Sequence, residues 1–315
     1  MSDNDFHAIK ADVIIDFITN YQLKNPIILA YVRPESNEVN YEKSIIKGLS
    51  EYGEVIYLAN LNGRLFIRDA LITAHYSSQY RFSVYPIREM EKYPEIINDF
   101  EEHFHIKFKD ANIIGPFDAI LKMGISDDDL FNRIVDKNDF LKFCGQTIKR
   151  IGDYFVTNYN IPYLIKRYNP QSNIFVITVR LNSEDINFMA INQSIFEQMQ
   201  INKNNFIDED ILKSMEWNEK IKRTYHVSRN HLTATFDMLD FIIRNNGSHL
   251  DISETPLGMR LIDDHSFTKE DILMMKDRQI FYINDSKGRR LVNILDEANG
   301  LSIEECINML KNLEF

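Results

Sequence analysis

The sequence is poor in cysteine, proline and glycine, the residues that form disulfides, turns and loops. Its 315 residues include only 2 cysteines, 8 prolines and 11 glycines. Cys144 and Cys306 are far apart and no CxxC spacing occurs, so neither a disulfide framework nor a zinc knuckle is predicted. The low proline and glycine content also leaves no low-complexity linker, which indicates a chain that folds along most of its length.

Several common functional signatures are missing as well. There is no GxGxxG, no GxxxxGK[ST] and no GxSxG, which are the signatures of dinucleotide binding, of phosphate-binding loops and of many hydrolases. No catalytic residue, cofactor or metal ion can therefore be named from motifs. The sequence gives no positive indication of an enzyme, and we expect a non-catalytic role.

Excess positive charge and long apolar runs are absent too. The formal net charge is −11, with 47 acidic and 36 basic side chains, so nothing attracts the chain generally to nucleic acid or anionic lipid. The longest apolar runs fall far short of the ~20 residues of a membrane span, and the polar start MSDNDFHAIK does not resemble a signal peptide. We expect a cytoplasmic protein without a membrane partner.

What the sequence does contain is a repeated segment. VRPESNEVNY (residues 32–41) and VRLNSEDINF (179–188) each follow an apolar run directly, PIILAYV in one case and NIFVITV in the other. Three further pairs occur in the same order: FITNY with FVTNY, DF (99–100) with DF (240–241), and ISDDDLF with FTKEDIL. Ordered matches of this kind predict an internal duplication.

Short apolar strands alternate with helical patterns in the first copy. We expect strands at Ile27–Val32, Val55–Ala59 and Arg81–Tyr85, and helices at Phe6–Tyr21, Tyr41–Tyr52, Leu65–Tyr76 and Arg88–His103. The second copy should open with a helix at Phe140–Tyr159. This alternation predicts α/β architecture: two tandem, duplicated, three-layer-like domains with mainly parallel sheets, at residues 1–138 and 139–276, followed by a β-hairpin and helix at 277–315.

Polar loops that follow the expected strands form the candidate binding site. In parallel sheets such loops meet at one edge, where an arginine fork and free backbone amides suit a phosphate or carboxylate. The candidate ligand-binding residues are Arg33, Ser36, Asn40, Arg64, Arg88, Arg180, Ser183, Asn187 and Arg229. A purely structural reading explains the same residues: the arginines pair with neighbours such as Glu35, Glu89 or Glu184, while the Ser and Asn side chains cap helices.

The function that fits these features is regulatory or scaffolding: a tandem α/β protein that binds a small anionic ligand or a partner protein. An enzyme acting on a phosphorylated or carboxylated metabolite is the first alternative. Arg33 and Arg180 would then orient the substrate, with an acid or base among His75, His103 and Asp99. His103 and His105 would lie on one face of a strand as metal ligands sometimes do, but no third ligand is evident and no metal site is predicted.

A DNA-binding regulator is the second alternative. Residues 220–236, KIKRTYHVSRNHLTATF, form the most basic run of the chain, and VSRNHLTATF resembles the recognition-helix stretch of AraC-type helix-turn-helix regulators. The resemblance implies a helix that reads the major groove. The repeat explains the same residues as the third strand and following helix of the second copy, so nucleic acid is not the favoured partner.

Overall fold

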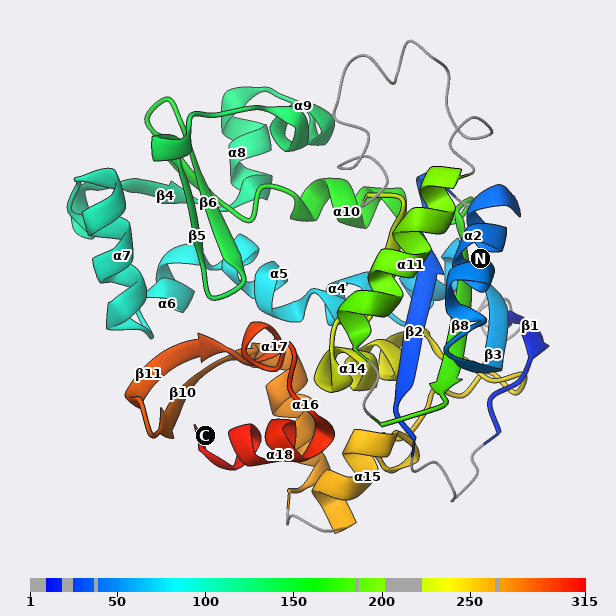
Figure 1. Ribbon diagram of the computed structural model, residues 1–315. Coiled ribbons are helices and arrows are strands. Elements are labelled where there is room, and N and C mark those ends of the chain that lie inside the picture. Colours follow the sequence, from blue (N-terminus) through cyan, green and yellow to red (C-terminus); the bar gives the residue numbers. More distant parts are fainter. Residues whose placement is uncertain (1–9, 19–24, 37–38, 185–186, 202–222, 264–266) are drawn as a thin grey trace. The chain divides into compact units, whose positions relative to one another are not determined.

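The computed structural model describes residues 10–18, 25–36, 39–184, 187–201, 223–263 and 267–315 (Figure 1). The chain divides into two compact units, each made of several segments. Unit 1 consists of Met1–Leu71, Tyr168–Leu273 and Ala298–Lys311, and unit 2 of Ile72–Arg167, Met274–Glu297 and Asn312–Phe315. The chain thus enters each unit more than once, and the boundary expected between residues 138 and 139 lies within unit 2.

Unit 1 is built on a five-stranded sheet in which every neighbouring pair is antiparallel. In sheet order the strands are β1 (Asp12–Ile15), β3 (Gly53–Asn62), β8 (Asn173–Leu181), β2 (Ile27–Val32) and β9 (Tyr225–Val227). The expectation of mainly parallel sheets is therefore wrong. β2 and β3 do run in the same direction, but β8 lies between them. Likewise β8 and β9 run in the same direction with β2 between them. The sheet therefore contains two β-α-β units, and a strand of each lies between the two strands of the other.

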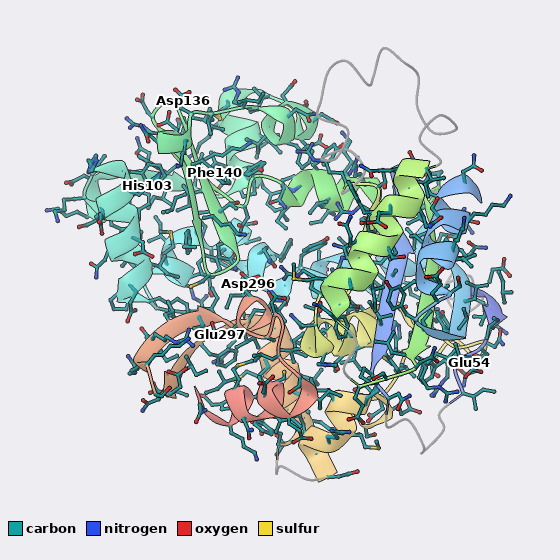
Figure 2. The ribbon with its side chains drawn as sticks, viewed as in Figure 1. Glu54, His103, Asp136, Phe140, Asp296 and Glu297 are labelled. Atoms are coloured by element: carbon teal, nitrogen blue, oxygen red, sulfur yellow. The ribbon has the colours of Figure 1, made fainter. Side chains whose placement is uncertain are left out.

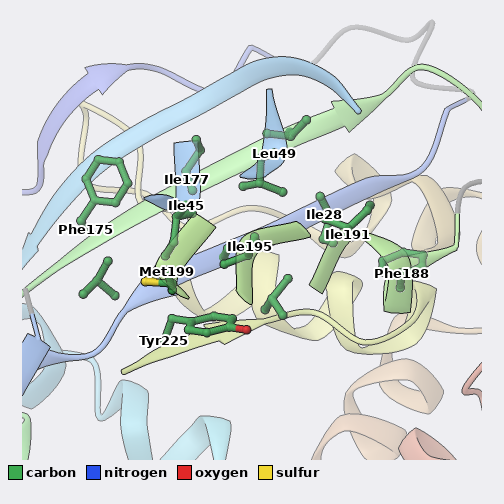
Figure 3. Packing of buried hydrophobic residues seen from close by; sticks show 14 of the residues in the cluster. Ile28, Ile45, Leu49, Phe175, Ile177, Phe188, Ile191, Ile195, Met199 and Tyr225 are labelled. Atoms are coloured by element: carbon green, nitrogen blue, oxygen red, sulfur yellow. The ribbon is translucent and has the colours of Figure 1, made fainter. Parts of the chain in front are cut away.

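Two helices, α2 (Val39–Leu49) and α11 (Phe188–Ile201), cover one face of this sheet. Their apolar side chains form a single core with the central strands. Figure 3 shows Ile45 of α2 and Ile191 and Ile195 of α11 packed beside Ile28 of β2 and Ile177 of β8. The two segments that carry the similar decapeptides, β2–α2 and β8–α11, thus contribute adjacent central strands and the two helices on one face.

The opposite face of the sheet carries α14 (His231–Phe241), which contacts β2, α15 (Pro256–Asp263) and α18 (Ile303–Lys311). Every residue of α14 except Leu239 is buried. A helix that is covered on all sides belongs to an interior layer, and this explains why β2 is buried at every position on both of its faces. Unit 1 also contains α3 (Gly63–Arg68) and the 3-10 turns η1 (Pro34–Ser36) and η5 (Ile252–Glu254).

Unit 2 has a four-stranded sheet in the order β4 (Asn112–Ile114), β7 (Tyr154–Thr157), β6 (Gln146–Ile151) and β5 (Phe140–Phe143). Only β4 and β7 pair in parallel. The helix expected at Phe140–Tyr159 is therefore wrong, because these residues form β5, β6 and β7. Cys144 and Gly145 both have positive φ, at 39° and 77°, and Gly152 has φ of 59°. Such residues make tight hairpin turns, which the apolar spacing alone did not indicate.

The chain of unit 2 also forms several short helices, the first of which begins at its boundary with unit 1. They are α4 (Leu71–His75), α5 (Ser77–Val84), α6 (Pro86–Met90), α7 (Pro94–Phe104), α8 (Pro116–Met123), α9 (Asp127–Asn132) and α10 (Ile161–Arg167), with 3-10 turns η2 (Phe108–Asp110) and η3 (Lys137–Asp139). The strand expected at Arg81–Tyr85 lies mostly in α5. The core of unit 2 is aromatic: the rings of Phe100, Phe104 and Phe155 lie 4.9–5.0 Å apart, centroid to centroid.

The helix expected at Leu65–Tyr76 is divided into α3 and α4, because Ala70 has φ of 49° and interrupts the helical backbone. Within the helix expected at Phe6–Tyr21, the described residues include a strand, β1. Residues 1–9 and 19–21 lie outside the described ranges.

The C-terminal part has the expected hairpin and helix. α16 (Lys269–Arg278) leads into β10 (Ile280–Asp285), which pairs with β11 (Gly288–Asn293) and with β12 (Leu313–Glu314). α17 (Ile294–Glu297) follows β11, and α18 begins after Ser302. Among the described residues no helix is both long enough and apolar enough to span a membrane.

Candidate anion site in unit 1

Strand direction determines which loops of unit 1 meet. β8 and β9 both run antiparallel to β2, so both end at the same end of the sheet. α11 follows β8 and α14 follows β9, and the N-termini of these two helices therefore lie at that end. β2 and β3 end at the opposite end, as shown by the pairing of Ile27, the first residue of β2, with Arg180 near the end of β8.

The structure consequently separates the candidate residues into groups. At one end of the sheet are Arg33, Ser36, Asn40 and Arg64, which follow β2 and β3, and at the other are Arg180, Ser183, Asn187 and Arg229. Arg88 belongs to α6 of unit 2. The two similar decapeptides therefore place their Arg and Ser residues at opposite ends of one sheet.

Several of these residues have structural partners. Arg180 forms an ion pair with Glu54 near the start of β3, and the Arg88 guanidinium lies 5.7 Å from the centre of the Tyr85 ring. Figure 2 labels Glu54. Asn40 lies within α2, and Ser36 is buried. Arg180 is thus paired with a glutamate, as the purely structural reading expects, but the partner is Glu54 and not one of the glutamates named there.

Two of the candidate residues, Asn187 and Arg229, line one cavity. Its volume is about 310 Å³. Its wall consists of residues from three helix starts and the loops that precede them: Glu184, Asn187, Phe188, Met189, Arg229, Asn230, His231, Gly300, Leu301, Ser302 and Glu305. α11, α14 and α18 all begin here, so three helix dipoles present their positive ends to one space.

Side-chain caps fix the geometry of these helix starts. Asn230 accepts a hydrogen bond from the Thr233 amide at 2.8 Å, and the Thr233 hydroxyl accepts one from the Asn230 amide at 3.0 Å. The Asn230 side chain also donates to Asn299 at 2.8 Å, which connects the start of α14 to the loop before α18. At α11, Asn187 accepts from the Met189 amide at 2.8 Å.

His231, the first residue of α14, is the most distinctive group in the cavity wall. It is only 6% exposed and packs edge-on against Phe188. Within the described part of the chain its ring nitrogens have no hydrogen-bond partner. Burial, reinforced by the positive charge of Arg260, lowers the pKa of His231 to about 4. The imidazole is thus neutral at physiological pH.

The carboxylates in the wall are already engaged. Arg260 of α15 lies 3.3 Å from Glu184 and 2.8 Å from Glu304, nitrogen to oxygen. Glu305 accepts hydrogen bonds from the amide and hydroxyl of Ser302, both at 2.9 Å, and these hold its pKa below the ordinary value. Arg229 also lines the cavity and is exposed.

The other proposed sites find less support in the structure. His103 lies in α7 (Figure 2), and His105 ends that helix with φ of 54°, so the pair does not lie on a strand as expected. In the basic segment, residues 220–222 lie outside the described ranges. The stretch that resembles a recognition helix begins α14, where residues 231–236 are all buried and present no face to a groove.

A second polar cluster of unit 1 contains a serine, a histidine and an aspartate. The Asp237 carboxylate accepts a hydrogen bond from Ser228 at 2.6 Å and lies 2.8 Å from Nε2 of His226. The serine hydroxyl donates to the carboxylate or to the carbonyl of Leu29, 3.1 Å away, rather than to the imidazole. This geometry does not activate the serine as a nucleophile.

Sequence reasoning missed His231, Ser302 and Glu305 as members of one site. Ser302 and Glu305 were recognisable as a helix cap, but nothing local in the sequence indicates that α18 begins beside α14. No protein-family model, curated protein or solved structure matches the chain.

Proposed function

We propose that the protein binds a small phosphate- or carboxylate-bearing ligand in this cavity and acts as a regulatory or scaffolding component. The observation that carries the proposal is the start of three helices at one cavity that Arg229 also lines. Helix N-termini and a guanidinium both favour negative charge, and together they suit an anionic group. A volume of about 310 Å³ fits a metabolite rather than a macromolecule.

The character of the cavity wall supports binding over catalysis. The hydroxyl of Ser302 is bonded to Glu305, whose lowered pKa makes it a weak base. His75, His103 and Asp99, which an enzyme was expected to use, do not line the cavity. An enzyme acting on a similar metabolite remains the alternative, and turnover of a bound ligand would establish it.

A thermal-shift screen tests the proposal. Inorganic phosphate and a panel of phosphorylated and carboxylated metabolites are added to the full chain. A ligand at a hundred times its Kd stabilises by about 2.7 kcal/mol, which raises Tm by several degrees. Arg229→Ala should reduce the shift, whereas Arg33→Ala, at the opposite end of the sheet, should leave it unchanged. Flat melting curves with every anion would contradict the proposal.

A further inference from the structure

We infer that the ligand of this cavity is a zwitterion, an α-amino acid with an apolar side chain, rather than a simple anion. The inference rests on the proposed anion-binding function and specifies its ligand class. The carboxylate of the ligand lies beside Arg229 and the starts of α11 and α14, and its ammonium lies beside Glu184 and Glu305. Its side chain covers the apolar part of the wall.

The charge of the wall is the first argument. Its described residues include two carboxylates, Glu184 and Glu305, and one guanidinium, Arg229. The low pKa of His231 keeps the imidazole neutral at pH 7. These side chains thus leave the wall with one more negative than positive charge, and both carboxylates repel a simple anion. An α-amino acid carries one charge of each sign at pH 7, so it can satisfy the guanidinium and the carboxylates together.

The second argument is that both carboxylates keep an oxygen for an ammonium. Glu305 accepts both bonds from Ser302 through Oε2, and its Oε1 has no partner among the residues that the structure describes. Glu184 contacts Arg260 through Oε1 only, at 3.3 Å. Arg260 also pairs with Glu304, 2.8 Å away and outside the wall, which offsets its charge. An ammonium has three N–H donors, and its hydrogen bonds to carboxylates are charge-assisted.

The apolar part of the wall supplies the third argument. Phe188, Met189 and Leu301 line the cavity beside the charged groups. Phe188 is buried, but Met189 in the first turn of α11 is 74% exposed. An apolar side chain of the ligand that covers this surface removes it from water, which stabilises the complex. The cavity volume of about 310 Å³ accommodates an amino acid of the size of leucine, methionine or phenylalanine.

Isothermal titration calorimetry of the full chain at pH 7 tests the inference from the side of the ligand. The probes are L-leucine, L-methionine and L-phenylalanine, each compared with the acid that lacks its amino group and the amine that lacks its carboxylate. For leucine these analogues are 4-methylpentanoate and 3-methylbutylamine. At least one amino acid should bind, and each of its two analogues should bind about three- to fivefold more weakly, the effect of losing a solvent-exposed ion pair.

Variants test the inference from the side of the protein. Glu305→Gln keeps the cap on Ser302, because an amide oxygen accepts the same bonds, but lacks the charge. The affinity ratio of the amino acid to its des-amino acid should fall towards one in this variant. Glu197→Gln removes an exposed carboxylate of α11 outside the wall and should keep the wild-type ratio. Arg229→Gln should weaken both acids equally, because both carry the carboxylate.

Other results would overturn the inference. Des-amino acids that bind the wild type as tightly as the amino acids exclude the zwitterion while the anion site stands, and a wild-type ratio in Glu305→Gln excludes the role of that carboxylate. Inorganic phosphate is titrated in parallel. Binding of phosphate without binding of any amino acid contradicts the inference alone, and binding of none of the probes contradicts the proposed function as well. The comparison of ligands on the wild type decides the inference even if Glu305→Gln does not fold.

Discussion

The ring of Phe188 packs edge-on against the imidazole of His231, with centroids 4.9 Å apart and ring planes at 86°. Phe188 is the first residue of α11 and His231 the first of α14. These helices cover opposite faces of the sheet of unit 1, so the contact joins the two helical layers around the end of the sheet. It also keeps both helix starts at one cavity.

Stability at acid pH should depend on His231. Its pKa is about 4 in the folded protein and about 6.5 in an unfolded chain, so the unfolded state takes up this proton first as the pH falls. The folded state loses up to about 3 kcal/mol of stability between pH 6.5 and 4 from this group. Chemical unfolding at pH 7.0 and 4.5 should show a loss about 2 kcal/mol smaller in His231→Gln. Equal losses in both proteins would contradict the assignment.

Arg260 should contribute to the low pKa of His231, of which burial is the larger cause. Its positive charge helps to lower the pKa of the imidazole, so Arg260→Gln should raise that pKa towards 6.5. The titration can be followed by NMR on the His231 ring carbon, assigned by its loss in His231→Gln. Arg244→Gln removes another partly buried arginine of unit 1, which is paired with Glu254, and serves as the control. The idea fails if both variants leave the titration in place.

The hydroxyl of Tyr57 should contribute to the stability of unit 1. It donates to the Ile243 carbonyl at 2.9 Å and accepts from the Ile243 amide at 3.1 Å, within the buried interior. Tyr57→Phe leaves two buried backbone groups unsatisfied and should lower the free energy of unfolding by about 2–4 kcal/mol. Tyr225→Phe removes a bond to the exposed side chain of Asn192 and should cost about 1 kcal/mol or less. Urea denaturation compares the two, and equal losses would count against the buried role of Tyr57.

Gly53 should tolerate no side chain. A Cβ added there would lie 2.0 Å from the carbonyl oxygen of Arg180, inside the pairing of β3 with β8. Gly53→Ala must separate the strands and should cost about 3 kcal/mol. Gly247→Ala meets no atom within 4 Å and bears only the strain of its positive φ, about 1–2 kcal/mol. Similar melting temperatures for the two variants would show that β3 and β8 are not paired as described.

Part of the local structure was readable from the sequence. The apolar runs PIILAYV (26–32) and NIFVITV (173–179) predict β2 and β8. The turn NDSKG and the Ser302–Glu305 cap predict the C-terminal hairpin and the start of α18. Each of these signals lies within a few residues of the element it predicts. Apolar spacing fails as a guide where it fits both a helix and strands, as in residues 140–159. There the turns at Gly145 and Gly152 lead to strands.

The arrangement of the elements was not readable. Strands that follow one another in the sequence are neighbours in most sheets, and that rule places β2 beside β3. Here β8 separates them, and the sheet becomes antiparallel. Because of this one difference, Arg33 and Arg180 lie at opposite ends of the sheet. It also brings Asn187 and Arg229 to the same cavity, together with His231. In the sequence, His231 is recognisable only as a residue at a helix start.

The order of β2 between β8 and β9 also has a consequence during protein synthesis. Both partners of β2 lie far downstream of it, beyond residue 172. A ribosome adds roughly 5–20 residues per second, so a fully apolar strand waits on the order of ten seconds before either neighbour has been made. Until then its backbone hydrogen-bonding groups are available to other chains, and the nascent protein is at its most prone to aggregation and to capture by chaperones.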